Sequence, residues 1–227
     1  MALNAEHERV VKEHASTILA RLDNHGPERR LLVGISGVPG SGKSWFAQFL
    51  AEEIDKTRPN ITKIVGMDGW HLTREHLRQS QDPEMMFARR GAEFTFDAAG
   101  FAEFVDTLHQ PINPDVTLLA PSFDHAVKDP CPDAVRIEPN HRIVLIEGLY
   151  CNANTGQWAK AASMMDVRYN IEVDGQVAIQ RLAQRHLNAG ITQTYEEGLQ
   201  RASGSDMING QWVLAHLLQP CTSIAFP

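Results

Sequence analysis

The stretch GISGVPGSGKS, residues 34–44, decides how the rest of the chain is interpreted. It follows the apolar run RLLVGIS (30–36), which predicts a buried strand, and precedes SWFAQFLAEEI (44–54), whose apolar residues recur at helical spacing. The pattern GxxxxGK[ST] is filled by Gly37, Gly42, Lys43 and Ser44. Between a strand and a helix, such glycines let successive backbone N–H groups turn toward one anion at the positive end of the helix dipole. The stretch therefore predicts a phosphate-binding loop.

The polar residues of this loop have expected partners on a nucleotide. Lys43 is expected to reach the β- and γ-phosphates, and the Ser44 hydroxyl is expected to bind Mg²⁺. The alternative is a glycine-rich turn with an incidental lysine, which the flanking strand and helix argue against. We predict that ATP is bound by Gly37, Gly40, Ser41, Gly42, Lys43, Ser44 and Trp45.

Composition and charge restrict the class of protein. The 227 residues are 43% hydrophobic and 22% charged, which is ordinary for a globular chain long enough for one large α/β domain. The net charge of −7 argues against a general nucleic-acid-binding protein, because such proteins usually carry a basic excess. Cys131, Cys151 and Cys221 are widely spaced, form no CxxC pair and fit a reducing compartment.

No segment of the sequence predicts targeting or membrane insertion. The first residues include Glu6, Glu8 and Glu13, whereas transit peptides avoid acids and signal peptides need an unbroken apolar core. No apolar run approaches the roughly 20 residues that a membrane helix requires. We therefore expect a cytoplasmic protein without a membrane or nucleic-acid partner.

Strand and helix patterns alternate along the chain. Apolar runs predict strands at 30–36, 61–68, 115–123, 141–148, 165–173 and 222–227. Helical spacing predicts helices at 5–22, 44–54, 96–110, 175–190 and 192–203. This alternation predicts an α/β fold with a parallel sheet and helices on both faces, in a single domain spanning 1–227 with an N-terminal helical segment (1–25). Ligands bind beyond the carboxyl ends of the strands in such sheets, so the informative residues are expected there.

Two acids lie at predicted strand ends. Glu147 closes the most continuously apolar strand, 141–148, and is placed to hold a metal ion or its water; alternatively it only marks where the strand meets solvent. Asp68 ends the second strand, between Gly66 and Gly69. A kinase that phosphorylates a hydroxyl needs a carboxylate to orient that hydroxyl and accept its proton. An aspartate in a turn also commonly caps the next helix.

The predicted helix 175–190 carries Arg181 and Arg185 four residues apart, and therefore on one face. Two guanidinium groups on one face can clamp transferring phosphates as a lid closes over them. The alternative is a basic face that contacts only solvent, and the spacing alone favours this alternative.

The motifs taken together resemble a known group of kinases. Their order and spacing are similar to those of the phosphoribulokinase/uridine kinase group of P-loop kinases, which includes pantothenate kinases and nicotinamide riboside kinases. The likeness is carried by GISGVPGSGKS (34–44), GMDGWHL (66–72), RRGAEFTFD (89–97), PSFDH (121–125) and IVLIEGLY (143–150). MDGWHL and RRGAEFTFDAAGF look most similar to a branch described as fructose-transport-system or nucleoside/nucleotide kinase-like proteins. The resemblance runs from the strand 30–36 onward and implies a three-layer P-loop NTPase-type fold with a small helical lid.

This resemblance also implies roles for individual residues. It implies that Asp68 is the catalytic base, that Glu147 serves Mg²⁺ and its water beside Ser44, and that residues 180–195 form the lid. The catalytic residues are then expected to be Asp68, Lys43, Arg185 and Arg181. The contacts to the phosphate acceptor are expected from His71, Arg90, Phe123, Asp124 and His125.

Several of these residues also have a simpler interpretation. Phe123 can be a core residue at a strand end, and His71 can be a surface histidine. Arg89 and Arg90 either bind an anionic acceptor or line a solvated face. Asp97 is first of all an N-cap for the helix that follows it.

The sequence departs from the uridine kinases in one segment. Their stretch SHSR, which helps to recognise the pyrimidine, is HAVKD (125–129) here, so uridine is not the expected acceptor. The segment RASGSDMING (201–210) is similar to the less characterised branch, and the roles of its Arg201, Asp206 and Asn209 are left open.

These features predict a Mg²⁺- and ATP-dependent phosphotransferase that acts on a hydroxyl of a small metabolite of nucleoside, sugar or vitamin-precursor type. The alternative is an ATP-binding regulatory protein that hydrolyses ATP slowly and has no acceptor. No NKxD motif is present, so guanine selectivity is not expected. The identity of the acceptor is left open, as is the oligomeric state, for which a homodimer is one option.

Overall fold

The computed structural model describes residues 4–124 and 126–225. Its centre is a five-stranded sheet in the order β2-β5-β1-β6-β7, in which every neighbouring pair is parallel. The strands are β1 (Leu31–Gly37), β2 (Thr62–Gly66), β5 (Ile143–Glu147), β6 (Val167–Glu172) and β7 (Thr222–Ala225). β1 lies in the middle of the sheet, and the glycine-rich loop follows directly from its carboxyl end.

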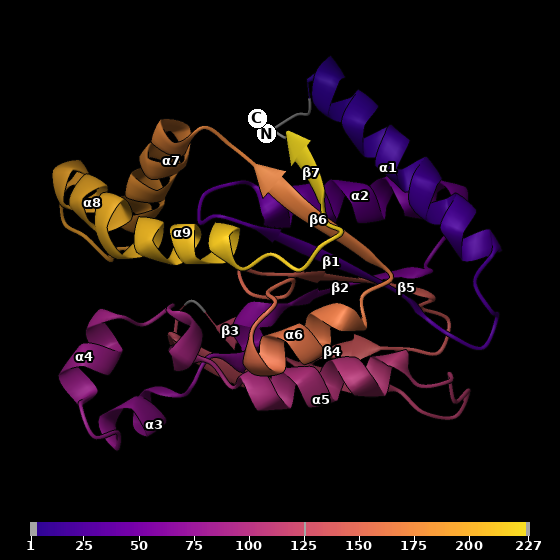
Figure 1. Cartoon of the computed structure of the whole chain (residues 1–227), viewed down its shortest axis with the longest axis horizontal. Helices are drawn as coiled ribbons and strands as arrows, with labels where there is room; N and C mark the ends of the chain where they lie inside the picture. Colours follow the sequence, from indigo (N-terminus) through magenta and orange to yellow (C-terminus); the bar gives the residue numbers. More distant parts are fainter. Residues whose placement is uncertain (1–3, 125, 226–227) are drawn as a thin grey trace.

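Helices cover both faces of this sheet (Figure 1). They are α1 (Ala5–Asp23) and α2 (Lys43–Thr57) on one face, and α5 (Ala98–His109) and α6 (Gly156–Ser163) on the other. Because side chains alternate along a strand, Val33 of β1 is buried in the core beneath α1 and α2, and Leu32 is buried in the core beneath α5 and α6. The predicted three-layer α/β fold is confirmed.

Local signals account for several helix boundaries. The predicted N-cap of α5 is confirmed, because the Asp97 carboxylate accepts a hydrogen bond from the backbone N–H of Gly100 at 2.9 Å. The predicted helices 175–190 and 192–203 correspond to α7 (Gly175–Asn188) and the shorter α8 (Tyr195–Arg201). α8 starts at Tyr195 because Thr194 and Glu197 form a capping box just before and within its first turn.

The pairing of the predicted strand 115–123 differs from the expectation. The strand exists as β3 (Leu118–Asp124), but it pairs antiparallel with β4 (Asp129–Ile137) in a separate two-stranded sheet. The sequence did not indicate β4 because its residues, DPCPDAVRI, include two prolines and are mostly exposed, so no apolar run marks them. The hairpin packs on the segment that follows β2, at the edge of the main sheet.

Additional helices gather near the carboxyl ends of the strands. They are α3 (Arg74–Arg78), α4 (Pro83–Ala88) and α9 (Met207–Ala215), with the shorter turns η1 (Met67–Trp70), η2 (Glu93–Thr95) and η3 (Ala202–Asp206). Figure 1 shows α7, α8 and α9 on one side of these strand ends and α3 and α4 on the other. No helix within the described ranges is both long enough and apolar enough to cross a bilayer.

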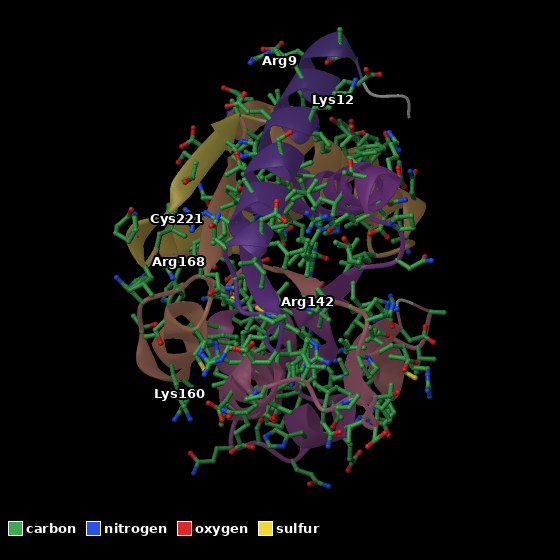
Figure 2. All side chains as sticks on the ribbon, turned by 90° about the vertical axis from the view of Figure 1, so that its right-hand side faces the viewer. Arg9, Lys12, Arg142, Lys160, Arg168 and Cys221 are labelled. Atoms are coloured by element: carbon green, nitrogen blue, oxygen red, sulfur yellow. The ribbon has the colours of Figure 1, made fainter. Side chains whose placement is uncertain are left out.

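At the amino ends of the strands, arginine side chains donate hydrogen bonds to backbone carbonyls. Figure 2 shows Arg142 close to the last turns of α1, and its guanidinium donates to the carbonyls of Gly26 and Arg29 at 3.0 and 3.1 Å. Arg168 donates in the same way to the carbonyl of Met165 at 2.9 Å. These contacts fasten the segments that follow α1 and α6 to the amino ends of β5 and β6, far from the glycine-rich loop.

Candidate active site

Three strands of the parallel sheet end at one edge and supply the candidate site. Gly66 of β2 and Ile35 of β1 are both in register with Glu147, the last residue of β5. The chain after β1 forms the glycine-rich loop, and the chain after β2 forms η1, which contains Asp68. The sheet thus brings the two predicted strand-end acids and the loop together.

The shape of the loop depends on glycine at two positions. Gly40 and Gly42 have φ angles of 79° and 91°, in the left-handed region that side chains disfavour. A Cβ atom on Gly40 would also lie 2.7 Å from the carbonyl oxygen of Ala178 in α7, which is too close. The loop therefore packs directly against the helix that carries the two predicted lid arginines.

The loop directs its polar residues toward its own interior and toward α2. Ser41 is fully buried, and its hydroxyl has no hydrogen-bond partner among the described residues. Gly42 precedes the first turn of α2, which starts at Lys43. An unpartnered buried hydroxyl costs stability, so a ligand that reaches Ser41 would satisfy a group that the protein leaves open.

The carboxylate of Glu147 is the point at which the charged residues meet. Burial raises its pKa most strongly, and the nearby Asp68 raises it further. The pKa is lowered by the Lys43 charge, by a hydrogen bond from the Ser44 side chain, and by the Arg185 charge. Five predicted residues therefore lie around one strand end, and a half-buried acid faces two cations there.

The two predicted lid arginines are not placed alike. Arg185 acts on Glu147 from the last turn of α7, whereas Arg181 lies one turn earlier on the same helix. Arg181 is exposed, and the described residues give it no hydrogen bond or ion pair. Arg185 is exposed too and has no such bond within the described part of the chain, so what associates it with the other charged groups is that its charge lowers the pKa of Glu147.

His71 stands beside Asp68 in a layer of rings. Its Nδ1–H donates to the backbone carbonyl of Asp68 at 2.8 Å, which fixes the ring. The ring centre lies 4.0 Å from that of Phe96 and 4.7 Å from that of Phe123 in the β3–β4 hairpin. Two predicted acceptor contacts, His71 and Phe123, are therefore in contact with each other, and the Asp68 side chain itself is exposed.

Arg90 is engaged by the protein itself. Its guanidinium donates to the Asp129 carboxylate at 2.9 Å and to the carbonyls of Leu72 and Lys128 at 3.0 and 2.6 Å. It also lies 5.6 Å from the ring centre of Phe123. Arg90 thus does not lie on a solvated face; it joins the β3–β4 hairpin to the chain that follows η1.

Of the remaining predicted contacts, Asp124 and Trp45 lie at the surface. Asp124 accepts from the backbone N–H groups of Ala126 and Val127 at 2.8 and 3.1 Å and so caps the turn of the hairpin. His125 lies outside the described residues. Trp45 is 46% exposed, and its ring meets Phe49 edge-on, with ring centres 6.2 Å apart.

Tyr150 and Asn152 follow Glu147 in the chain and support the candidate site. The sequence alone did not point to either residue. Tyr150 is buried, and its hydroxyl donates to the carbonyl of Gly91 at 2.7 Å. Asn152 is buried, and its amide donates to the carbonyls of Gly34 and Tyr169 at 3.1 and 3.0 Å, which ties β1 to β6. The available signal was the polar residues that directly follow the most apolar strand of the chain.

A further link between distant segments involves Arg89. Its guanidinium donates to the side-chain oxygen of Asn209 in α9 at 3.4 Å. Nearby, His186 Nε2 in α7 lies 2.7 Å from Asp206 Oδ2. Sequence reasoning singled out Asp206 and Asn209 without a role, because the partners of both are remote in the chain.

Within residues 4–124 and 126–225, no three His, Cys, Asp or Glu side chains cluster as ligands for a metal ion. The oxygen-bearing groups at the strand ends are the carboxylates of Asp68 and Glu147 and the hydroxyl of Ser44. A metal ion held here would have to complete its coordination with water or with ligand oxygens.

The relatives found by sequence and those found by structure are both described as kinases or putative kinases. The chain is 39% identical to “Putative uridine kinase C227.14” of Schizosaccharomyces pombe, over 85% of this chain and 82% of that protein. It is similar to the crystal structure of a “putative fructose transport system kinase” from Silicibacter sp. TM1040, with a TM-score of 0.81, 31% identity, and coverage of 96% of this chain and 98% of that one.

The fold is also similar to that of a yeast protein. YFH7 from Saccharomyces cerevisiae, described as “a putative P-loop containing kinase with a circular permutation”, has a TM-score of 0.86 at 23% identity, with coverage of 96% of this chain and 99% of that one. At that identity the likeness concerns the fold alone. No protein-family model matches the chain.

Proposed function

Since the chain belongs to the P-loop kinase family, we propose that it transfers the γ-phosphoryl group of ATP to a hydroxyl of a small metabolite. The observation that carries the proposal is the meeting of Lys43, Ser44, Asp68 and Arg185 around Glu147. Phosphoryl transfer requires mainly positioning and neutralisation of charge, with one carboxylate beside the acceptor hydroxyl. This set contains cations, a carboxylate pair and a hydroxyl at the end of a phosphate-binding loop.

The donor half of the proposed site is the glycine-rich loop with the first turn of α2. Backbone N–H groups of the loop and the Lys43 ammonium would hold the β- and γ-phosphates, and the buried hydroxyl of Ser41 would gain a partner there. The residues also fit Mg²⁺, because Ser44 and Glu147 offer oxygen atoms and this ion keeps waters and phosphate ligands. Mg²⁺, when bound, would neutralise charge on the phosphates.

The proposed step uses Asp68 as the base. The acceptor oxygen forms a bond to the γ-phosphorus while the bond between that phosphorus and the β–γ bridging oxygen breaks, and its electron pair leaves with ADP. The proton of the acceptor hydroxyl passes to the Asp68 carboxylate. Lys43 and Arg185 neutralise the charge on the transferring group, and residues 180–195 act as the lid that carries Arg185.

The acceptor half of the proposed site lies between η1 and the β3–β4 hairpin. The aromatic layer of His71, Phe96 and Phe123 forms one wall beside Asp68. Arg90 supports that wall through Asp129 and the backbone rather than binding the acceptor directly. We therefore expect the acceptor to be a small hydroxylated metabolite that fits beside this wall.

A panel of nucleosides, sugars and vitamin precursors, each tested for acceptor-dependent formation of ADP, is the first experiment. An acceptor that increases ADP formation should also raise the melting temperature further in the presence of ATP and Mg²⁺. ATP hydrolysis that no acceptor increases, with no further thermal shift, would instead support the regulatory alternative.

The role of Asp68 is tested by Asp68→Asn. This variant should bind ATP as the wild type does and lose most of its phosphoryl transfer, by about 10²- to 10⁴-fold for loss of a general base. Asp97→Asn is the matched control, because it makes the same change of acid to amide while an asparagine N-cap preserves the start of α5. Substantial transfer by Asp68→Asn to a verified acceptor would show that another group takes the proton.

A further inference from the structure

The helical run after α8 is broken at one residue, and the break brings an acid against α7. Gly204 in η3 has φ −88° and ψ −106°, outside the helical region. Two residues later, Asp206 Oδ2 lies 2.7 Å from His186 Nε2. The side chain of His186 is only 6% exposed and that of Asp206 18% exposed. A polar contact this well covered holds its two elements together more firmly than a surface ion pair does.

His186 fixes the last turn of the helix that carries Arg185. It directly follows Arg185, and its backbone carbonyl accepts hydrogen bonds from the N–H groups of Ile191 and Thr192 at 2.9 and 3.4 Å. The Arg185 guanidinium, in contrast, has no hydrogen bond or ion pair among the described residues. Its position near Glu147 therefore depends on where α7 places its backbone.

The other end of this connection is α9, which rests on the candidate site. Gly210 packs so closely on Val38 of the glycine-rich loop that a Cβ atom there would lie 3.2 Å from the valine side chain. Asn209 is buried and binds Arg89 on the acceptor side. Asp206 immediately precedes α9. A chain of contacts thus runs from Val38 through α9 and Asp206 to α7. Figure 1 shows α9 beside α7 and α8.

We propose that Asp206 is a positioning residue, which holds Arg185 over the phosphate-binding loop through His186. The inference rests on the proposed function, because it gives Asp206 a purpose only if Arg185 acts on the transferring phosphoryl group. It assigns a role to the segment SGSDMING (203–210): Gly204 allows the turn, Asp206 binds α7, and Asn209 and Gly210 secure α9.

A double-mutant cycle tests the coupling. Asp206→Ala is expected to lower kcat by about ten- to a hundredfold, as a displaced phosphate-stabilising group does, while the Kd for ATP changes little. In an Arg185→Ala background the same change should lower kcat by less than about twofold, because the positioned group is already absent. Asp206→Asn, which can still accept a hydrogen bond from His186, should retain most of the activity.

The matched control is Asp174→Ala, which removes the carboxylate that caps the other end of α7. Its effect on kcat should be the same with and without Arg185. The proposal would be overturned if Asp206→Ala lowered kcat by the same factor with and without Arg185, which is the result expected for the control. If Asp206→Ala fails to fold, Asp206→Ser takes its place in the cycle.

Amide hydrogen exchange gives a second readout that does not need an acceptor. Asp206→Ala should speed exchange over residues 185–190 and leave α2 unchanged, and Asp206→Asn should restore protection. Unchanged exchange in the last turn of α7 would also overturn the proposal. Absence of transfer by the wild type with every acceptor would instead refute the proposed function, while the exchange data would still decide whether Asp206 orders α7.

Discussion

Replacing Tyr150 by phenylalanine removes one buried hydroxyl and keeps the ring, so its effect follows from the contacts of a single oxygen. That oxygen donates to the carbonyl of Gly91 at 2.7 Å, and the ring packs against Phe96 and Trp212. Tyr150→Phe leaves the packing intact and the carbonyl of Gly91 without its partner. Loss of such a buried hydrogen bond costs about 1.5 kcal/mol. At about 2–4 °C per kcal/mol for a domain of this size, the melting temperature should fall by about 3–6 °C.

Tyr169→Phe is the matched control for this prediction. The Tyr169 hydroxyl lies 3.3 Å from His14 Nδ1, a longer contact on the face covered by α1, so its loss should cost less. Both variants are compared by thermal unfolding and by titration with ATP, whose affinity should not change in either. The reasoning is refuted if Tyr150→Phe melts at the wild-type temperature, or if it is no less stable than Tyr169→Phe.

Three further changes have expected outcomes. Gly40→Ala should lower the free energy of unfolding by about 1–2 kcal/mol because the backbone of Gly40 is left-handed. It should also weaken ATP binding, because the new Cβ would meet Ala178. Gly175→Ala is the control, since no atom lies within 4 Å of a Cβ there, and thermal melting and ATP titration should show neither effect. Burial raises the pKa of Tyr169 to about 12, so the folded state keeps a proton that the unfolded state loses above pH 10. The contribution of this group to stability should therefore be full below pH 10 and should fall between pH 10 and 12. Urea unfolding across this pH range should show a smaller fall for Tyr169→Phe. Asp97→Ala should lower the free energy of unfolding by about 1 kcal/mol through loss of the α5 cap, with ATP affinity unchanged; equal stability to wild type in urea would contradict that assignment.

The parts of the fold that the sequence could predict are those whose signal is local. The strand before Gly37, the strand ending at Glu147 and the cap at Asp97 are encoded in neighbouring residues, and all appear where the pattern indicates. The β3–β4 pairing was not predictable in this way. Its second strand is exposed and contains prolines, so only tertiary contact with β3 and η1 makes it a strand.

The same distinction applies to the candidate site. Asp68 and Glu147 could be expected at one edge, because the carboxyl ends of parallel strands meet there. The engagement of Arg90 by Asp129, and of His186 by Asp206, depends on side chains that the fold brings together from separate segments. Spacing within one helix likewise could not separate Arg185 from Arg181; in the structure the charge of Arg185 lies near enough to lower the pKa of Glu147.

The order of strands in the sheet has a consequence for how the protein is made. β1 carries the glycine-rich loop, yet its two neighbours, β5 and β6, come much later in the chain, after α5 and the β3–β4 hairpin. During synthesis β1 therefore remains without a partner until those strands leave the ribosome, and such long-range pairing is slow. The nucleotide site would then be among the last parts of the molecule to form. A chain that stops before β5 would have the loop sequence but no sheet to hold it in shape.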